Sequence, residues 1–188
     1  MNYAFACFNA SQYKKKLKQW YKCATSDTQM WNYEEPGQLV LLYQFIQIML
    51  DNAWVIYGCD EILTRWKKEP YENERMYNKP KLEEQKGVAK FSLSEEELKE
   101  PHLVFSALFG NYHLTYDKII LQDWLRAALF SDTAESKAKD FFLALNKLIE
   151  AWYLINFRLC YPDKDPLVFT EEMKTKQGDK TKSDPNIN

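Results

Sequence analysis

The feature that most constrains this chain is a stretch of apolar sequence from residue 38 to residue 66 that contains no proline. Its residues recur at steps of three and four, the spacing that places side chains on one face of an α-helix. The positions on this stripe are Leu39, Leu42, Ile46, Met49, Ala53, Ile56, Asp60 and Leu63. Further apolar residues widen the stripe, namely Val40, Phe45, Ile48, Trp54, Val55 and Ile62. The pattern predicts a helix of roughly 43 Å that its neighbours cover on most sides.

A membrane-spanning helix is the alternative interpretation of the same stretch. Residues 37–59 carry one charged side chain, Asp51, and are long enough to cross a bilayer. Burying Asp51 near the centre of the bilayer would cost about 2.5–3.5 kcal/mol, and Gln44 and Asn52 add further polar groups. The sequence therefore favours a buried helix of a soluble protein, with no membrane partner.

Composition limits the classes of fold and partner. The chain has 188 residues, of which 46% are hydrophobic and only 5 are glycine, so one helical domain with a sizeable core is expected. Its 25 basic and 27 acidic residues leave a net charge of −2, which gives no overall attraction for nucleic acid. The four cysteines are scattered without a C-x-x-C pair, as is typical of reduced thiols in a cytoplasmic protein.

Capping and stop signals place the other helices. Ser11 is the expected N-cap of a helix that runs to about residue 24, and another helix is expected over 116–130. Ser94 with Glu97, and Asp132 with Glu135, match the capping-box spacing. The second of these precedes a stripe of apolar residues that continues to the Tyr161-Pro162 pair, and Gly110 is the expected end of the helix before residue 116.

Together these elements predict an all-α, single-domain helical bundle of about five helices. The two long helices, 38–66 and 132–161, are expected to pack antiparallel. The bundle domain would cover residues 1–162, with a long polar connection over 71–92. Residues 163–188 are charged and contain almost no large apolar side chain, so we expect a flexible C-terminal tail.

Motifs for catalysis or metal binding are missing from the sequence. The only two histidines, His102 and His113, are not part of an E-x-x-H or H-x-x-x-H pair, so no metal site is expected. Neither G-x-x-x-x-G-K-[ST] nor G-x-G-x-x-G occurs, which excludes the Gly-rich phosphate loops. We therefore expect no cofactor and assign no catalytic residue.

One polar constellation is a candidate ligand site. Asp123 and Arg126 share a predicted helix that His113 precedes, and Arg126 could pair with Glu150 on the last helix. One interpretation is a polar pocket between helices, formed by His113, Asp123, Arg126 and Glu150. The alternative is a structural ion pair that orients the helices without binding a ligand.

These observations favour a non-enzymatic function, as a helical scaffold or protein-interaction module that binds a protein partner or a second copy of itself. Trp31 and Trp66, near predicted helix ends, are the candidate interaction anchors. A ligand-binding or enzymatic bundle using the polar pocket is the first alternative. RNA binding through the lysine-rich helix over 11–24 is a weaker one, because a solvated amphipathic face is the favoured explanation of its lysines.

Overall fold

The structure, a computed structural model, describes residues 9–26, 31, 36–59, 91–111, 113–130, 133–135 and 138–160. These residues form helices and no strand, which confirms the prediction of an all-α bundle. In chain order the helices are α1 (Ala10–Thr25), α2 (Pro36–Tyr57), α4 (Glu95–Lys99), α5 (Leu103–Asn111), α6 (Leu114–Phe130) and α7 (Lys139–Cys160).

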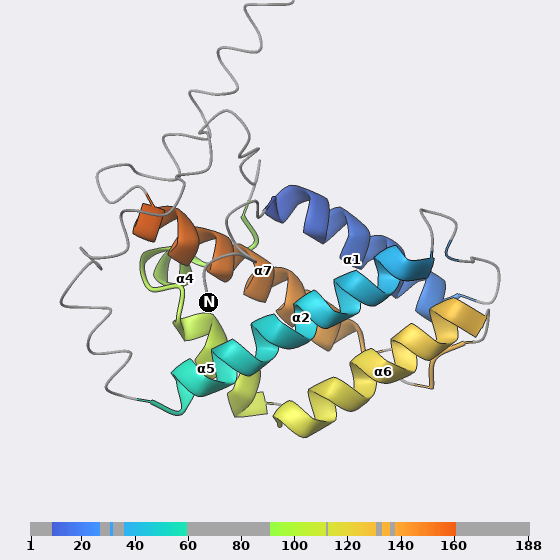
Figure 1. Cartoon of the computed structure of the whole chain (residues 1–188). Coiled ribbons are helices and arrows are strands. Elements are labelled where there is room, and N and C mark those ends of the chain that lie inside the picture. Colours follow the sequence, from blue (N-terminus) through green and yellow to red (C-terminus); the bar gives the residue numbers. More distant parts are fainter. Residues whose placement is uncertain are drawn as a thin grey trace, which may run out of the picture.

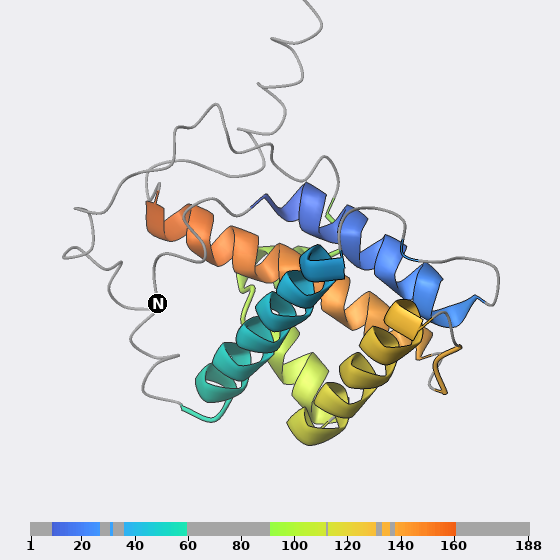
Figure 2. The same cartoon turned by 45° about the vertical axis from the view of Figure 1, so that its right-hand side comes forward.

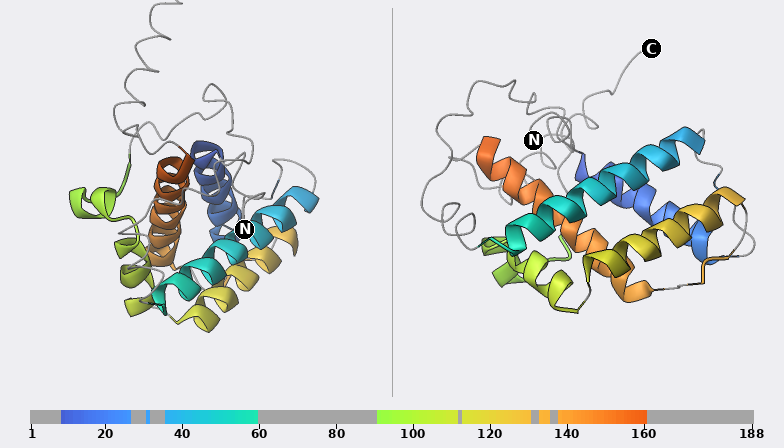
Figure 3. Two further views of the ribbon diagram at one scale, coloured as in Figure 1. Left: turned by 60° about the vertical axis from the view of Figure 1, so that its left-hand side comes forward. Right: turned by 60° about the horizontal axis from the view of Figure 1, so that its bottom comes forward.

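The four longest helices form two crossed pairs. Figures 1 and 2 show α1 beside α7 and α2 beside α6, with the α2/α6 pair lying across the α1/α7 pair. The α1/α7 pair is antiparallel, because Lys14 contacts Glu150 while Tyr21, further along α1, stacks on Phe142, earlier in α7, with ring centroids 4.5 Å apart. Helix α5 closes one end of the bundle against α2 and α7 (Figure 3).

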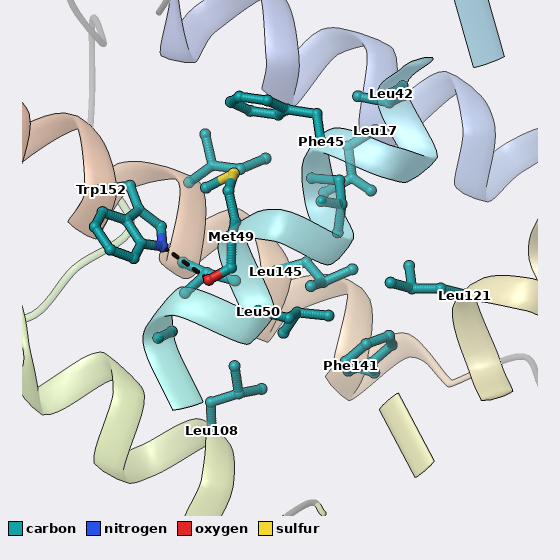
Figure 4. Close-up of a cluster of buried hydrophobic side chains, with 14 of the residues drawn as sticks. Leu17, Leu42, Phe45, Met49, Leu50, Leu108, Leu121, Phe141, Leu145 and Trp152 are labelled. Carbon is teal, nitrogen blue, oxygen red and sulfur yellow. Dashed lines mark hydrogen bonds between the residues drawn. The ribbon is translucent and has the colours of Figure 1, made fainter. Parts of the chain in front are cut away.

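The core lies where the two pairs cross. Apolar side chains from α1, α2, α5, α6 and α7 meet there (Figure 4), among them Leu17, Leu50, Leu108, Leu121 and Leu145. Trp20, on α1, is fully buried and lies edge-on to Trp124, on α6, with centroids 6.2 Å apart. Aromatic side chains of this size bury large apolar areas, and this pair joins α1 to α6 within the core.

The two longest helices, α2 and α7, meet in this core but do not run side by side. The indole Nε1–H of Trp152 donates a hydrogen bond of 3.3 Å to the carbonyl oxygen of Met49 (Figure 4). Figure 3 shows the two helices crossing, so the antiparallel neighbour of α7 is α1 and that of α2 is α6. A stripe of apolar residues predicts that a helix face is covered, but it does not identify which helix covers it.

The first long helix is shorter than predicted. Helix α2 ends at Tyr57 instead of near Trp66, because Gly58 follows it and glycine is unfavourable within a helix by about 1 kcal/mol. The backbone N–H of Cys59 donates to the carbonyl of Ile56, an i to i−3 bond of the tighter kind that closes helix ends.

Of the residues predicted to begin helices, one is confirmed and two are wrong. The Ser94–Glu97 capping box is confirmed, with both of its reciprocal hydrogen bonds present. At α1 the cap is Asn9, not Ser11, and its side chain accepts a bond of 3.1 Å from the backbone N–H of Gln12. The prediction that Asp132 starts the last helix is wrong, since α7 begins at Lys139. The backbone of Ala134 instead donates a 2.7 Å bond to the carbonyl of Ala24, at the end of α1.

Within the described residues, α2 is the one helix long and apolar enough to cross a membrane. It buries eight of its side chains in the bundle, an arrangement compatible with a soluble protein. The predicted tail over 163–188, most of the connection over 71–92, and Trp66 lie outside the described residues.

Candidate functional site

A fully buried carboxylate, Glu150, lies at the contact between α1 and α7. Its Oε1 accepts a charge-assisted hydrogen bond from the ammonium of Lys14, on α1. Its Oε2 accepts two bonds from Ser92, one from the backbone N–H at 2.7 Å and one from the hydroxyl at 2.9 Å. Both oxygens are therefore bonded, which is the condition for burying a charge without a large desolvation penalty.

The residues expected to form a polar pocket with Glu150 are not brought to it. Arg126 is exposed and donates to Asp123 Oδ1 at 3.1 Å, three residues earlier on the same helix. His113 precedes α6, where its Nδ1 accepts a 3.3 Å bond from the backbone N–H of Thr115. The predicted pairing of Arg126 with Glu150 is wrong, because the Glu150 oxygens are bonded to Lys14 and Ser92. Sequence spacing placed both residues at helix borders but could not rank their partners.

The Lys14–Glu150 pair therefore has the geometry of a structural link between three parts of the chain: α1, α7 and the segment before α4. It also engages one lysine of the basic α1 run in an internal ion pair and leaves the Lys14 side chain only 24% exposed. Through both carboxylate oxygens, Glu150 links α7 to Lys14 on α1 and to Ser92.

Two further polar contacts attach α4 to α7. The ammonium of Lys147 donates to both carboxylate oxygens of Glu97 at 2.8 Å, and the guanidinium of Arg158 donates to the carbonyl oxygens of Leu98 and Lys99. The second contact satisfies carbonyls at the C-terminal end of α4 that have no partner within the helix. Both cations lie on α7, which therefore fixes a helix of only five residues that would not be stable alone.

The environment of Glu97 favours its charged form. Partial burial acts to raise the pKa of Glu97, but the hydrogen bonds from Lys147 and Ser94 and the positive charge of Lys147 outweigh it. The net result is a pKa below the ordinary glutamate value. Glu97 is thus ionised at neutral pH and paired.

Asp117, in the first turns of α6, is fully buried, and neither of its carboxylate oxygens has a hydrogen-bond partner among the described residues. Burial raises the pKa of Asp117 to about 7, because the charged form would lose its hydration without compensation. Asp117 therefore lies on the buried face of α6. Its spacing from Ile120 and Leu121, three and four residues later, was the available signal that it lies on the buried face.

The described residues give little support for a metal site or for a reactive cysteine. No group of three or more His, Cys, Asp or Glu side chains there could hold a metal ion. Cys23 and Cys59 are free thiols, and burial raises the pKa of Cys23, which disfavours the reactive thiolate.

The exposed face of α2 is the most unusual surface feature of the described residues. Leu41, Ile48 and Val55 are exposed to 59%, 46% and 57% and follow one another at intervals of seven. Positions seven apart lie within about 20° of each other on an α-helix, so the three side chains form one line. We call this line the α2 seam. The prediction that neighbours cover α2 on most sides is wrong along it.

Other candidate anchors are less suited to contact a partner. Trp31 is partly buried and packs on the core, so its indole is not a free surface anchor. Helix α6 also exposes large apolar side chains, namely Tyr116, Ile119 and Phe130. They alternate along the helix with charged residues, including Lys118, Asp123 and Arg126.

Comparison of the chain with protein-family models, with curated proteins and with solved structures found no match. The fold and the polar contacts described above define a helical bundle whose buried ion pair links its elements and whose α2 seam is open to solvent.

Proposed function

We propose that this protein is a non-enzymatic protein-interaction module of the cytoplasm, and that it binds an apolar helix along the α2 seam. The observation that supports the proposal is the line of Leu41, Ile48 and Val55. Residues seven apart lie on one line of a helix and occupy equivalent positions of successive heptads in helix–helix contacts. Exposed apolar side chains gathered on one face of a helix are a common feature of interaction sites on soluble proteins.

The charge distribution on α2 adds support. Asp51 is the one charged residue of its 22, although charged residues make up 28% of the whole chain. Asp51 is neutralised by Lys118, on α6, at 2.6 Å. A helix face that only contacts water gains from charged side chains and normally carries them, whereas the core of an interface is depleted in charge.

The polar groups support a structural role more than a catalytic one. The Glu150 carboxylate is bonded at both oxygens, and His113 accepts a bond from the backbone of Thr115. The free thiols of Cys23 and Cys59 fit a reducing compartment such as the cytoplasm.

Photo-crosslinking in the natural host tests the proposal. A photoreactive amino acid would replace Ile48 in one variant and Leu143 in another. Leu143 is a suitable control because it is 49% exposed but lies on α7, in the other helix pair. We expect one discrete protein adduct, identified by mass spectrometry, from position 48 and none from position 143. No adduct from position 48, or the same adducts from both positions, would overturn the proposal.

A further inference from the structure

We infer that the first turn of α6 is held closed on the bundle while Asp117 carries a proton, and that it opens locally when this proton is released. We call this turn, residues 114–117, the α6 start. The inference does not involve the α2 seam and goes beyond the proposed function. It follows from the burial of Asp117, from its lack of a hydrogen-bond partner among the described residues, and from its position in the first turn of a helix.

Asp117 is enclosed in the bundle without a polar partner in the described part of the chain. Its exposed fraction is 0%, and neither of its carboxylate oxygens accepts a hydrogen bond there. The other buried carboxyl groups of the described residues, those of Glu97 and Glu150, each accept a hydrogen bond from a lysine. An anion that loses its hydration without gaining a donor is strongly destabilised, whereas the neutral acid loses far less. The closed arrangement therefore favours the protonated form of Asp117.

The elements around the α6 start do not compensate a charge on Asp117. This turn follows α5, which has no titratable side chain, and α6 packs on α2 and on α1. The titratable side chains of these elements in the vicinity are His113 before α6, Lys118 on α6, Asp51 and Tyr57 on α2, and Tyr21 and Cys23 on α1. Lys118 is engaged by Asp51 at 2.6 Å. Burial is accordingly the cause that raises the pKa of Asp117.

The α6 start is held by few contacts that would oppose its opening. Figure 1 shows it at the edge of the bundle, directly after the end of α5. Its first backbone hydrogen bonds run from the N–H groups of Tyr116 and Asp117 to the carbonyl oxygen of His113, at 2.8 and 3.1 Å. The side chains of the Lys118–Asp51 pair are 37% and 48% exposed, and exposed ion pairs contribute little to stability. Because helix ends open at lower free energy than core elements, the opening that hydrates Asp117 does not require global unfolding.

The inner part of α6 stays attached when the α6 start opens. Trp124, two turns after Asp117, is fully buried and contacts the rings of Trp20 and Tyr21 on α1. Opening is therefore limited to the α6 start and to the amide groups that donate to its carbonyl oxygens. In an α-helix each N–H donates to the carbonyl four residues earlier, so the affected amides extend to residue 121.

The proton linkage has a definite sign and range. Burial raises the pKa of Asp117 to about 7 in the closed form, whereas the open, hydrated carboxyl has the ordinary pKa of 3.8. Between these values the closed form holds a proton that the open form has released, so opening becomes more favourable as pH rises. The opening equilibrium should increase roughly tenfold for each pH unit between pH 4 and pH 7 and become constant above about pH 8.

Hydrogen–deuterium exchange of the full chain, followed residue by residue by NMR, tests the pH dependence. The exchange rate of each amide is divided by its intrinsic rate at the same pH. We expect the corrected rates of the amides over 117–121 to be roughly a hundredfold higher at pH 8 than at pH 5. Corrected rates that do not change with pH would overturn the inference.

The same experiment in low concentrations of urea tests whether the opening is local. Local opening exposes little surface, so the exchange of residues 117–121 should hardly respond to urea below the unfolding transition. The buried amides of α7 over 148–155 should be better protected at every pH and should exchange faster as urea is added. Equal protection and equal urea dependence in the two segments would mean that the α6 start opens only by global unfolding, which contradicts the inference.

Two variants identify the responsible carboxyl group. Asp117→Asn keeps the shape of the side chain without the titration and should abolish the pH dependence at residues 117–121. Asp140, in the first turn of α7, is exposed, so Asp140→Asn should leave that dependence unchanged. His113 is present in both variants, so its own titration does not account for a difference between them. The same pH dependence in Asp117→Asn and in the unsubstituted protein would overturn the inference.

A direct titration keeps the inference testable if circular dichroism shows that Asp117→Asn is not folded. The carboxyl carbon of Asp117 in the unsubstituted protein is then followed by NMR as a function of pH. We expect its midpoint near pH 7, accompanied by faster exchange of the amides over 117–121. A midpoint near the ordinary value of 3.8 would show that the closed form accommodates the anion, and the inference would be wrong.

Discussion

Lys14 and Glu150 are separated by 136 positions in the sequence and form an ion pair in which the carboxylate is fully buried. The pair joins the first and the last helix of the bundle. Ser92 completes it by bonding the second carboxylate oxygen through its backbone N–H and its hydroxyl. A contact of this kind links three distant parts of the chain and makes the position of each depend on the other two.

Removing the cation of this pair should destabilise the protein. Lys14→Met leaves a buried carboxylate held only by Ser92, and we expect the free energy of unfolding to fall by about 2–4 kcal/mol, since breaking a buried pair from one side is costly. Urea denaturation followed by circular dichroism measures the change. The exposed Lys18, on the same helix, is the control, and Lys18→Met should change stability by less than about 0.5 kcal/mol.

Removing both charges together should be less harmful than removing one. The double variant Lys14→Met/Glu150→Leu exchanges the pair for apolar contacts of similar size, so we expect it to be more stable than Lys14→Met alone. If the double variant were the less stable of the two, the pair would not be compensating a buried charge in the way described.

Asp117 should make the protein less stable as pH rises. Its pKa is about 7 in the folded protein and 3.8 when unperturbed, so between these values the folded state holds a proton that the unfolded state has released. The contribution is fully present below about pH 4 and is lost as pH rises through 7. At 1.36 kcal/mol for each unit of pKa shift, the total is roughly 4 kcal/mol at most.

The neutral variant Asp117→Asn isolates this effect. The stability of Asp117→Asn relative to the unsubstituted protein should increase from pH 4 to pH 7 and become constant above about pH 8. Chemical denaturation at a series of pH values measures the difference, in which the titration of other groups largely cancels. A difference that does not change with pH would mean that Asp117 is ionised and solvated in the folded protein.

Lys147 should control the ionisation of Glu97. In Lys147→Met the hydrogen bonds and positive charge of Lys147 that lower the pKa of Glu97 are lost, while the partial burial of Glu97 and its hydrogen bonds with Ser94 remain, so the pKa should rise. A carboxyl whose pKa is lowered by folding stabilises the protein above its unfolded pKa, and this stability is lost as pH falls through the folded value. The variant should thus lose stability at neutral pH and approach the unsubstituted protein in acid. Titration of the Glu97 carboxyl carbon by NMR measures the pKa directly.

Gly110 offers a stabilising substitution. It lies within α5, and an added Cβ would meet no atom within 4 Å. Gly110→Ala should raise the free energy of unfolding by about 0.5–1 kcal/mol, because alanine loses less backbone entropy on forming a helix. Thermal and urea denaturation measure the gain, and a loss of stability would show that the space around Gly110 is filled in solution.

The sequence by itself determined the all-α class and the Ser94–Glu97 capping box. These depend on interactions between residues three or four positions apart, which spacing reveals directly. It also predicted where α7 would end, because proline at 162 cannot continue a helix.

The tertiary structure decided which helix faces touch which neighbours. The eight buried apolar positions on α2 and the three at its seam look equally hydrophobic in the sequence. Only the packing of the neighbouring helices leaves Leu41, Ile48 and Val55 in solvent. In the same way, Glu150 is bonded to Lys14 and not to Arg126. The partner of a charged side chain depends on how elements far apart in sequence pack, and periodicity within one helix contains no information about that.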